Sequence, residues 1–179
     1  MLNIDNTALV IVDVQGKLAT LMYQKEELFD NLVKIIKGAQ ALSLPIIWNE
    51  QIPDKLGPTI PEIAEILRGM EPLAKTTFSC CGNKGFQARL ENANRRQVLL
   101  VGIETHVCVY QTAIDLLQEG FEVYLVADAV SSRTQENKQI GIQAIKDAGA
   151  KITSVEMALF EMLKEARGDK FKQVIKIVK

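Results

Sequence analysis

Short apolar runs rich in β-branched residues alternate with longer amphipathic stretches along the chain. The first run, residues 8–14 (ALVIVDV), is nearly unbroken, which is typical of a parallel strand buried on both faces. Residues 26–43 repeat their apolar side chains at helical spacing, and Pro45 ends this stretch before a predicted strand at 46–48. This succession predicts an α/β domain whose helices cover both faces of a mainly parallel sheet.

The rest of the chain continues the alternation. Strands are predicted at residues 73–75, 97–103, 122–127 and 151–154, and helices at about 61–67, 86–92, 107–118 and 134–148, with two amphipathic helical stretches after them. Residues 49–59 (NEQIPDKLGPT) are predicted to form a loop. No repeat, low-complexity tract or linker divides the sequence. We therefore predict one domain over residues 1–179, with a three-layer α/β/α, Rossmann-like fold and a sheet of about six strands.

Composition excludes several classes of protein. The 179 residues are 47% hydrophobic, so the chain can form a core without disulfides or a structural metal. With 21 basic and 22 acidic residues, the net charge of −1 does not favour binding to nucleic acid or to an anionic membrane. No apolar run reaches the roughly 18 residues of a transmembrane helix. The N-terminus lacks signal-peptide features and the cysteine count is odd, so we expect a cytoplasmic protein.

A single histidine limits the chemistry further. Any Cys-His or Ser-His-Asp mechanism would have to use His106, and zinc sites with two histidines are excluded. Cys80, Cys81, Cys108 and His106 have the wrong spacing for a zinc site, because zinc-binding cysteines usually occur as C-x2–4-C. We therefore predict that the protein binds no metal and no cofactor.

Three residues with reactive side chains lie near the carboxyl ends of predicted strands: Asp13 and Lys75 at the ends of the first and third strands, and Cys108 on the helix that follows the fourth. In parallel α/β sheets, ligands bind beyond the carboxyl ends of the strands, and Asp13, Lys75 and Cys108 are expected there. Each also has a simpler interpretation. Asp13 could cap a helix or lie in a solvated turn, Lys75 could be solvated, and Cys108 could be a small buried apolar residue.

The surroundings of two of these residues favour a functional role. Asp13 interrupts an apolar run, where a charge is costly unless it is paired or used. Around Cys108 the sequence is GIETHVCV, in which Thr105 is a natural N-cap. Cys108 would then lie in the first helical turn, where the helix dipole and free N–H groups favour a thiolate and can bind an oxyanion. This position predicts a lowered pKa for the Cys108 thiol.

These segments resemble the isochorismatase-like cysteine hydrolase superfamily, which includes nicotinamidases and N-carbamoylsarcosine amidases. The similarity is greatest to its isochorismatase-domain-containing branch and covers nearly the whole chain. Five motifs carry the resemblance: ALVIVDVQ at 8–15, EQIPDKLGPT at 50–59, KTTFS at 75–79, GIETHVCV at 102–109 and VADAVSSR at 126–133. Their order and spacing together make the match specific.

The resemblance implies a catalytic triad. Asp13 would take the thiol proton, Lys75 would stabilise charge, and Cys108 would attack an amide-like carbonyl. The resemblance also implies a cis peptide bond between Ile103 and Glu104. The backbone N–H groups of Glu104 and Cys108 would then form the oxyanion hole. The pocket around them is expected to include Gln51, Phe78, Glu104 and Thr105.

The sequence also departs from parts of this superfamily. Nicotinamidases carry an Asp/His metal site in the loop after the second strand, and residues 49–59 contain no histidine, so nicotinamide is not the expected substrate. True isochorismatases lack the nucleophilic cysteine, so Cys108 favours acyl transfer. We predict a cysteine hydrolase that acts on a small amide or related C–N substrate through an acyl-enzyme. The alternative is an interaction protein or thiol sensor with little or no turnover.

Two smaller expectations concern the remaining residues. His106 is expected to line the substrate site or an interface without transferring protons, and Cys80 and Cys81 are expected to be inert or oxidation-sensitive loop residues. The C-terminal stretches MALFEMLKEA and FKQVIKIVK are strongly apolar, which predicts a homo-oligomer unless these side chains simply complete the core.

Overall fold

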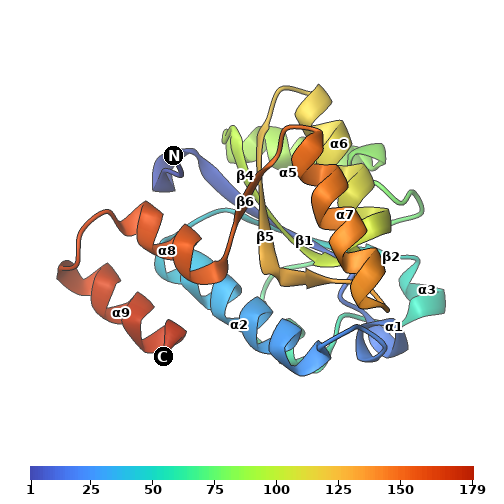
Figure 1. The fold of residues 1–179 in the computed structure, drawn as a ribbon, viewed down its shortest axis with the longest axis horizontal. Helices are drawn as coiled ribbons and strands as arrows, with labels where there is room; N and C mark the ends of the chain where they lie inside the picture. The colour runs from blue at the N-terminus through green and yellow to red at the C-terminus, as the bar shows by residue number, and fades with distance from the viewer.

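Six parallel strands form one sheet in the computed structural model, which describes residues 1–179 (Figure 1). The strand order is β3-β2-β1-β4-β5-β6. The strands are β1 (Thr7–Val12), β2 (Ile46–Gln51), β3 (Leu73–Lys75), β4 (Gln97–Ile103), β5 (Glu122–Ser131) and β6 (Lys151–Thr153). The predicted α/β fold with a Rossmann-like parallel sheet is confirmed.

Helices connect these strands as the sequence pattern predicts. They are α1 (Gly16–Thr20), α2 (Lys25–Ala41), α3 (Pro53–Leu56), α4 (Pro61–Ala64), α5 (Lys84–Ala93), α6 (Tyr110–Gln118), α7 (Gln135–Asp147), α8 (Val155–Leu163) and α9 (Gly168–Val178). The short helices α1 and α3 were not predicted, because five or four residues are too few to show helical periodicity. Strands β2 and β5 extend further at their carboxyl ends than the apolar patterns indicate, because their last residues include polar side chains.

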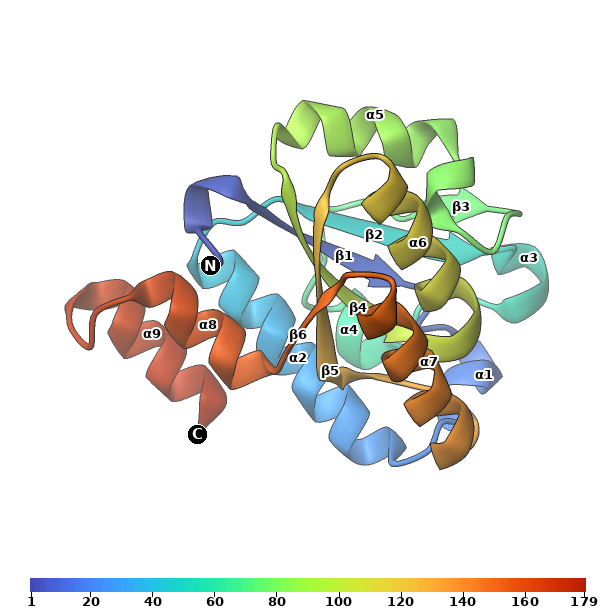
Figure 2. The ribbon, with the colours of Figure 1, turned by 45° about the horizontal axis from the view of Figure 1, so that its top comes forward.

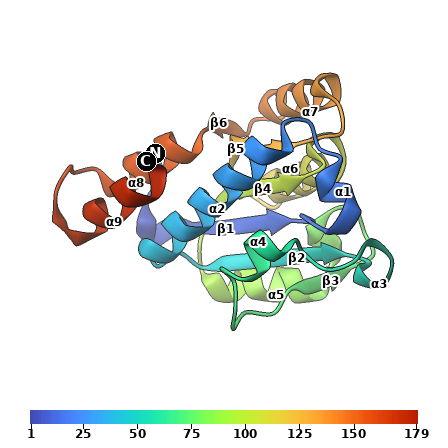
Figure 3. The ribbon, with the colours of Figure 1, turned by 90° about the horizontal axis from the view of Figure 1, so that it is seen from below.

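The sheet is covered on both faces. Along β1, Leu9 and Ile11 belong to one apolar cluster, and Val10 and Val12 belong to the other. Helices α1, α2, α4, α8 and α9 contribute to the first cluster, and α5, α6 and α7 contribute to the second. Figures 2 and 3 show these two layers on either side of the strands. A strand buried on both faces explains the unbroken apolar run in the sequence.

The order of the strands indicates where a ligand would bind, namely at the C-terminal ends of the strands where the order reverses. Connections from β1 lead to β2 on one side, whereas β4 lies on its other side, so the strand order reverses beside β1. The chain is closely packed at this edge. Gly102 has φ +117°, and a Cβ at this position would lie 2.1 Å from the carbonyl oxygen of Val12. Only glycine at position 102 permits β4 to approach β1 this closely. The close approach lies at Val12, the residue just before Asp13.

The C-terminal helices account for much of the apolar excess within one chain. On α8, Leu159 and Met162 are buried, and Leu159 packs over Gly38 of α2. On α9, Val174 is buried in the same cluster, whereas Met157 at the start of α8 is 60% exposed. The buried residues of α8 and α9 therefore complete the core of one chain, which was the alternative to a subunit interface. The homo-oligomer stays a prediction. None of the helices has both the length and the apolar character needed to cross a bilayer.

Candidate active site

Asp13 follows directly after the last residue of β1. Its backbone is left-handed, with φ +52°, a conformation that Asp tolerates better than most residues. The backbone N–H still donates to Asn49 on the neighbouring strand β2, at 3.2 Å. The side chain is 2% exposed. The Asp13 carboxyl group is therefore almost completely shielded from water, at the edge of the sheet where the strands have their C-terminal ends.

Lys75 ends β3 and lies against this carboxyl group. Its Nζ donates to Asp13 Oδ2 at 2.7 Å, and the lysine side chain is fully buried. Three further oxygens surround the ammonium: Gln51 Oε1 at 2.6 Å and the carbonyl oxygens of Thr77 and Phe78 at 3.0 and 2.9 Å. A buried ammonium needs such partners, because an unpaired charge would be very costly to remove from water. The predicted association of Lys75 with Asp13 is present.

Gln15 and Gln51 hold this pair in place. The Gln15 side chain accepts from the N–H of Gln51 at 2.6 Å and donates to the carbonyl of Gly57 at 2.8 Å, which fixes the end of β2 and the segment after it. Gln51 lines the cavity as predicted, yet its side-chain oxygen accepts from Lys75 and its amide donates to Thr76. The structure therefore gives Gln51 the contacts of a positioning residue. Sequence reasoning missed Gln15, although it lies in the first motif.

Cys108 lies where β4 turns into α6. The peptide bond between Ile103 and Glu104 is cis, as the resemblance implies, and a π-helical segment (Thr105–Val109) follows. The N–H of Val109 donates to the carbonyl of Glu104 at 3.2 Å, which closes this wide turn, and the N–H of Glu104 makes no hydrogen bond. Cys108 is 8% exposed at the start of the helix. The turn therefore presents a thiol beside an available backbone donor.

Burial governs protonation in the site. Burial raises the pKa of Asp13, and its contacts with Lys75 and the Cys108 thiol offset this only in part. Burial, followed by the negative charge of Asp13, also raises the pKa of Cys108, and Lys75 does not compensate. The expectation of a lowered pKa for Cys108 is wrong, because burial and the neighbouring Asp13 charge together outweigh the positive charge of Lys75. The thiol is therefore protonated at rest, next to a carboxyl group whose raised pKa makes it a better base.

The two other cysteines are also buried. Cys80 and Cys81 lie on a short 3-10 helix (Cys80–Gly82) rather than in an exposed loop, and the N–H of Cys80 donates to Thr112 on α6. Burial raises the pKa of each thiol to about 12. They therefore stay protonated in the folded protein at pH values where unfolded thiols ionise.

This difference predicts a loss of stability at alkaline pH. Above about pH 9 the unfolded chain releases the Cys80 proton and the folded chain retains it, so the free energy of unfolding falls as pH rises. Relative to Cys80→Ala, the wild type is expected to lose about 1.4 kcal/mol per pH unit. Urea unfolding of both proteins between pH 8 and 10.5 measures this. Parallel stability profiles would contradict it.

A small cavity of about 120 Å³ opens onto Asp13 and Cys108. Three polar residues line it, namely Asp13, Gln51 and Glu104. The other lining residues are apolar: Leu18, Leu56, Phe78, Ile103, Val107 and Cys108. Phe78, predicted for the pocket, is present and 55% exposed, so it lies at the mouth. Leu18 and Leu56 were missed because they belong to the unpredicted helices α1 and α3.

Two residues of the motif GIETHVCV lie elsewhere. Thr105 is fully buried, its hydroxyl has no hydrogen-bond partner, and it does not line the cavity. Thr105 is also not the N-cap, because the π-helical segment begins at this residue after Glu104. Gly141 of α7 packs against this backbone, with no room for a Cβ, which explains the burial. His106 Nδ1 lies 2.9 Å from Ser132 Oγ and is also outside the cavity.

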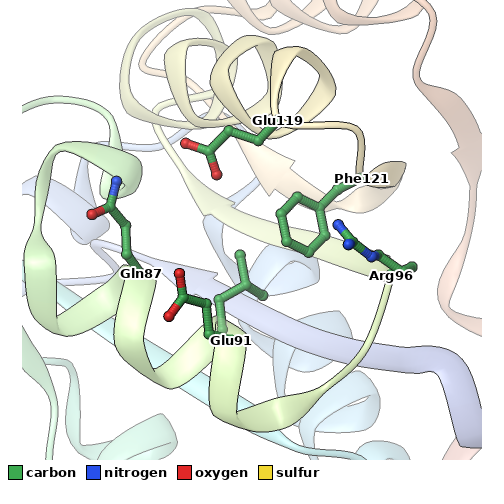
Figure 4. Close-up of a pocket in the computed structure, with 6 residues that line it drawn as sticks. Gln87, Glu91, Arg96, Glu119 and Phe121 are labelled. Atoms are coloured by element: carbon green, nitrogen blue, oxygen red, sulfur yellow. The ribbon is translucent and has the colours of Figure 1, made fainter.

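The largest hollow lies at the opposite edge of the sheet (Figure 4). It measures about 370 Å³ and is open to solvent between the end regions of α5 and α6. Arg96 and Phe121, which precede β4 and β5, line it, with the guanidinium 5.5 Å from the ring centre. Glu91 and Glu119 face the same space. No nucleophile or buried titratable group lies there, so the smaller cavity is the candidate active site.

The donor set of the site does not match a metal centre. No group of three His, Cys, Asp or Glu side chains is placed to hold a metal ion. Nicotinamidase-type metal ligands would occur in the segment after β2. Here Thr59 of that segment donates its N–H and its hydroxyl to Glu50 of β2, both at 2.7 Å. That hydrolysis needs no metal ion remains a prediction, which treatment with EDTA tests.

Fold and site together define a class, the isochorismatase-like hydrolases, and comparison with known proteins agrees. Residues 7–157 match the family model of the isochorismatase domain. Isochorismatase domain-containing protein 2 of Danio rerio is 33% identical over 178 residues, which is 99% of this chain and 89% of that protein. The chain therefore belongs to the isochorismatase family.

Two solved structures have the same fold. A structure titled as MAR1 ribonuclease of Caenorhabditis elegans has a TM-score of 0.93 and 36% identity, covering 99% of this chain and 91% of that one. The YcaC gene product of Escherichia coli, described as an octameric hydrolase of unknown specificity, has a TM-score of 0.93 and 22% identity, covering 98% and 88%. The second similarity shows the fold alone.

Proposed function

We propose that the protein is a cysteine hydrolase that releases an amine or ammonia from a small amide or related C–N substrate. The observation that carries the proposal is the Asp13–Lys75 pair beside a protonated Cys108 at one small cavity. A binding module has no need for a buried carboxyl, ammonium and thiol together. Family membership supports hydrolysis, and the amidase chemistry is our inference from the site.

The proposed reaction begins when Asp13 takes the thiol proton as Cys108 attacks the substrate carbonyl. The developing oxyanion is bound by the N–H groups of Glu104 and Cys108, which lie on the turn after β4. Asp13 then gives the proton to the leaving amine, and water hydrolyses the resulting thioester. Lys75 keeps the Asp13 carboxylate paired throughout, so its proton can move without isolating a buried charge.

A substrate panel tests this proposal. Primary amides, ureido acids and hydroxamates are supplied separately, and release of ammonia or hydroxylamine is measured before and after exhaustive EDTA treatment. We expect turnover of at least one class, with the rate unchanged by EDTA. Loss of activity that zinc or iron restores would overturn metal independence. No turnover of any compound would favour the alternative, an interaction protein or thiol sensor.

RNA belongs in the same panel because the C. elegans structure is titled as a ribonuclease. The site does not favour this activity. The net charge is −1, and the ammonium of Lys75, which lies beside the cavity, is enclosed by four oxygen partners. Phosphate-backbone binding needs accessible basic side chains. RNA cleavage that is lost in Cys108→Ala would replace the amidase proposal.

Asp13→Asn is expected to reduce kcat/KM by about 1,000-fold or more, because an amide can neither accept the thiol proton nor return it to the leaving group. The exchange keeps the size of the side chain and leaves an oxygen for Lys75. The rate of product release measures the effect, with Asp128→Asn as a control. Asp128, a half-buried carboxyl that accepts from the N–H of Val155, lies outside the cavity. Near wild-type turnover in Asp13→Asn would remove Asp13 from the mechanism.

Two properties of the whole protein also remain proposals, namely a cytoplasmic location and a homo-oligomer. The oligomer is supported by the octamer described for the E. coli protein and by large exposed apolar side chains at Phe78, Ile140 and Met157. Light scattering at micromolar concentration is expected to give a mass of at least twice 19.9 kDa. A monomeric mass would contradict the oligomer.

A further inference from the structure

The charged groups around the cavity are already paired with one another. Asp13 is bonded to Lys75, and Glu104 Oε2 accepts from the N–H and the Nε of Arg133, at 3.0 and 3.2 Å. Asp13 and Glu104 line the cavity, and neither of their cationic partners does. A ligand inside the cavity therefore meets two acidic groups and no uncommitted positive charge.

Lys75 has no hydrogen-bond donor left for a ligand. An ammonium group has three N–H donors, and four oxygens lie within 3.0 Å of this Nζ. Arg133 is 59% exposed and directed to Glu104. Lys17 and Lys55 are exposed on the neighbouring helices and line no part of the cavity. A substrate carboxylate would therefore lose its hydration without gaining a cationic partner.

The size and lining of the cavity point to the same class of ligand. Its volume of about 120 Å³ is well below the roughly 300–1,000 Å³ typical of pockets for drug-sized ligands. Six of its nine lining residues are hydrophobic. Leu18 and Leu56 form part of one wall, and Phe78 stands at the mouth, 55% exposed. Such a space suits a short apolar acyl group beside the nucleophile.

We propose that the site selects uncharged amides with short apolar acyl groups and rejects amides that carry a carboxylate, ureido acids and carbamoyl amino acids included. This inference rests on the proposed function and narrows it. The physical reason is that burying a carboxylate without a cationic partner is strongly unfavourable, whereas an isopropyl group of similar size gains from apolar contact.

A matched pair of substrates tests the selection directly. Succinamate and 4-methylpentanamide have the same number of heavy atoms and the same branching, with a carboxylate in one and an isopropyl group in the other. For the wild type, we expect kcat/KM to be at least ~100-fold higher for 4-methylpentanamide, because the carboxylate is desolvated without a partner. Equal values, or a preference for succinamate, would overturn the inference and leave the amidase proposal intact.

A second experiment introduces a positive charge among the residues that line the cavity. Leu56→Arg puts a cation on α3 at the cavity, where the leucine is 37% exposed. It is expected to reduce the preference for 4-methylpentanamide by at least ~10-fold, because the carboxylate gains a partner. Leu21→Arg is the matched control, since Leu21 is 51% exposed and does not line the cavity. An equal effect of both variants would show that long-range charge, not the cavity wall, sets the preference, and would overturn the inference.

Alkylation of Cys108 separates failure of the inference from failure of the proposed function, because it requires no turnover. Iodoacetamide and iodoacetate differ in charge, and mass spectrometry of the Cys108 peptide gives both rates. Relative to N-acetylcysteine amide in solution, we expect Cys108 to favour iodoacetamide by a further ~100-fold. If Cys108 shows this preference for iodoacetamide but no amide is hydrolysed, the amidase proposal is refuted. The inference that the cavity is apolar and rejects anions is then still supported. A ratio equal to that of the free thiol would overturn the inference.

Discussion

Cys108→Ser is expected to lower kcat/KM at least ~10,000-fold on any amide that the wild type hydrolyses. The serine hydroxyl is much less acidic than the thiol, so the single carboxyl of Asp13 is too weak a base to generate the nucleophile. Substitution changes one atom in a site that is 8% exposed, so the fold is expected to persist. Product release measures the rate, and mass spectrometry detects the acyl-enzyme, which should be absent in the variant.

The chain provides a matched control for this experiment. Cys81→Ala also removes a buried thiol, and Cys81 lies outside the cavity on the 3-10 helix. Its turnover is expected to stay within about threefold of wild type, because substitutions away from the reacting groups mainly affect stability. Near wild-type turnover in Cys108→Ser would end the acyl-enzyme mechanism. An equal loss in both variants would indicate general damage to the fold.

Lys75→Met is expected to destabilise the fold by about 3–5 kcal/mol at neutral pH. The variant removes the partner of Asp13, whose carboxylate is then buried without compensation, and also removes the donor to Gln51, Thr77 and Phe78. Without Lys75, the pKa of Asp13 should rise above its already raised value. The carboxyl group is then protonated in the folded state, and the remaining cost falls as pH decreases.

Urea unfolding measures this loss, and an exposed ion pair supplies the control. Lys151 donates to Glu122 at the same distance of 2.7 Å, yet these side chains are 53% and 46% exposed. Lys151→Met is expected to cost about 0–1 kcal/mol, because water already solvates both charges. The double variant Asp13→Asn/Lys75→Met should recover part of the lost stability. Equal costs for Lys75→Met and Lys151→Met would contradict the argument that burial makes the Asp13–Lys75 pair critical.

The fold was largely predictable because buried parallel strands have a strong local signature. The predicted strand at 97–103 matches β4, in which every residue is buried, since a largely apolar run covered on two faces needs no information from elsewhere in the chain. The predicted strand at 73–75 also matches β3, a short edge strand. The short helices α1 and α3 and the π-helical turn were not predictable. Their conformation depends on neighbours such as Gln15, which fixes Gly57 through a hydrogen bond across 42 positions.

The sequence by itself determined the class of fold, the candidate residues Asp13, Lys75 and Cys108 and their location at strand ends. Only the tertiary structure decided how these groups interact. It raised the pKa of Cys108 instead of lowering it, used Gln51 to hold Lys75, and buried Thr105 away from the cavity. The physical reason is that the apolar pattern that specifies a helix or strand lies within a short stretch of sequence. Desolvation, charge pairing and the shape of a cavity instead depend on which distant residues the fold brings together.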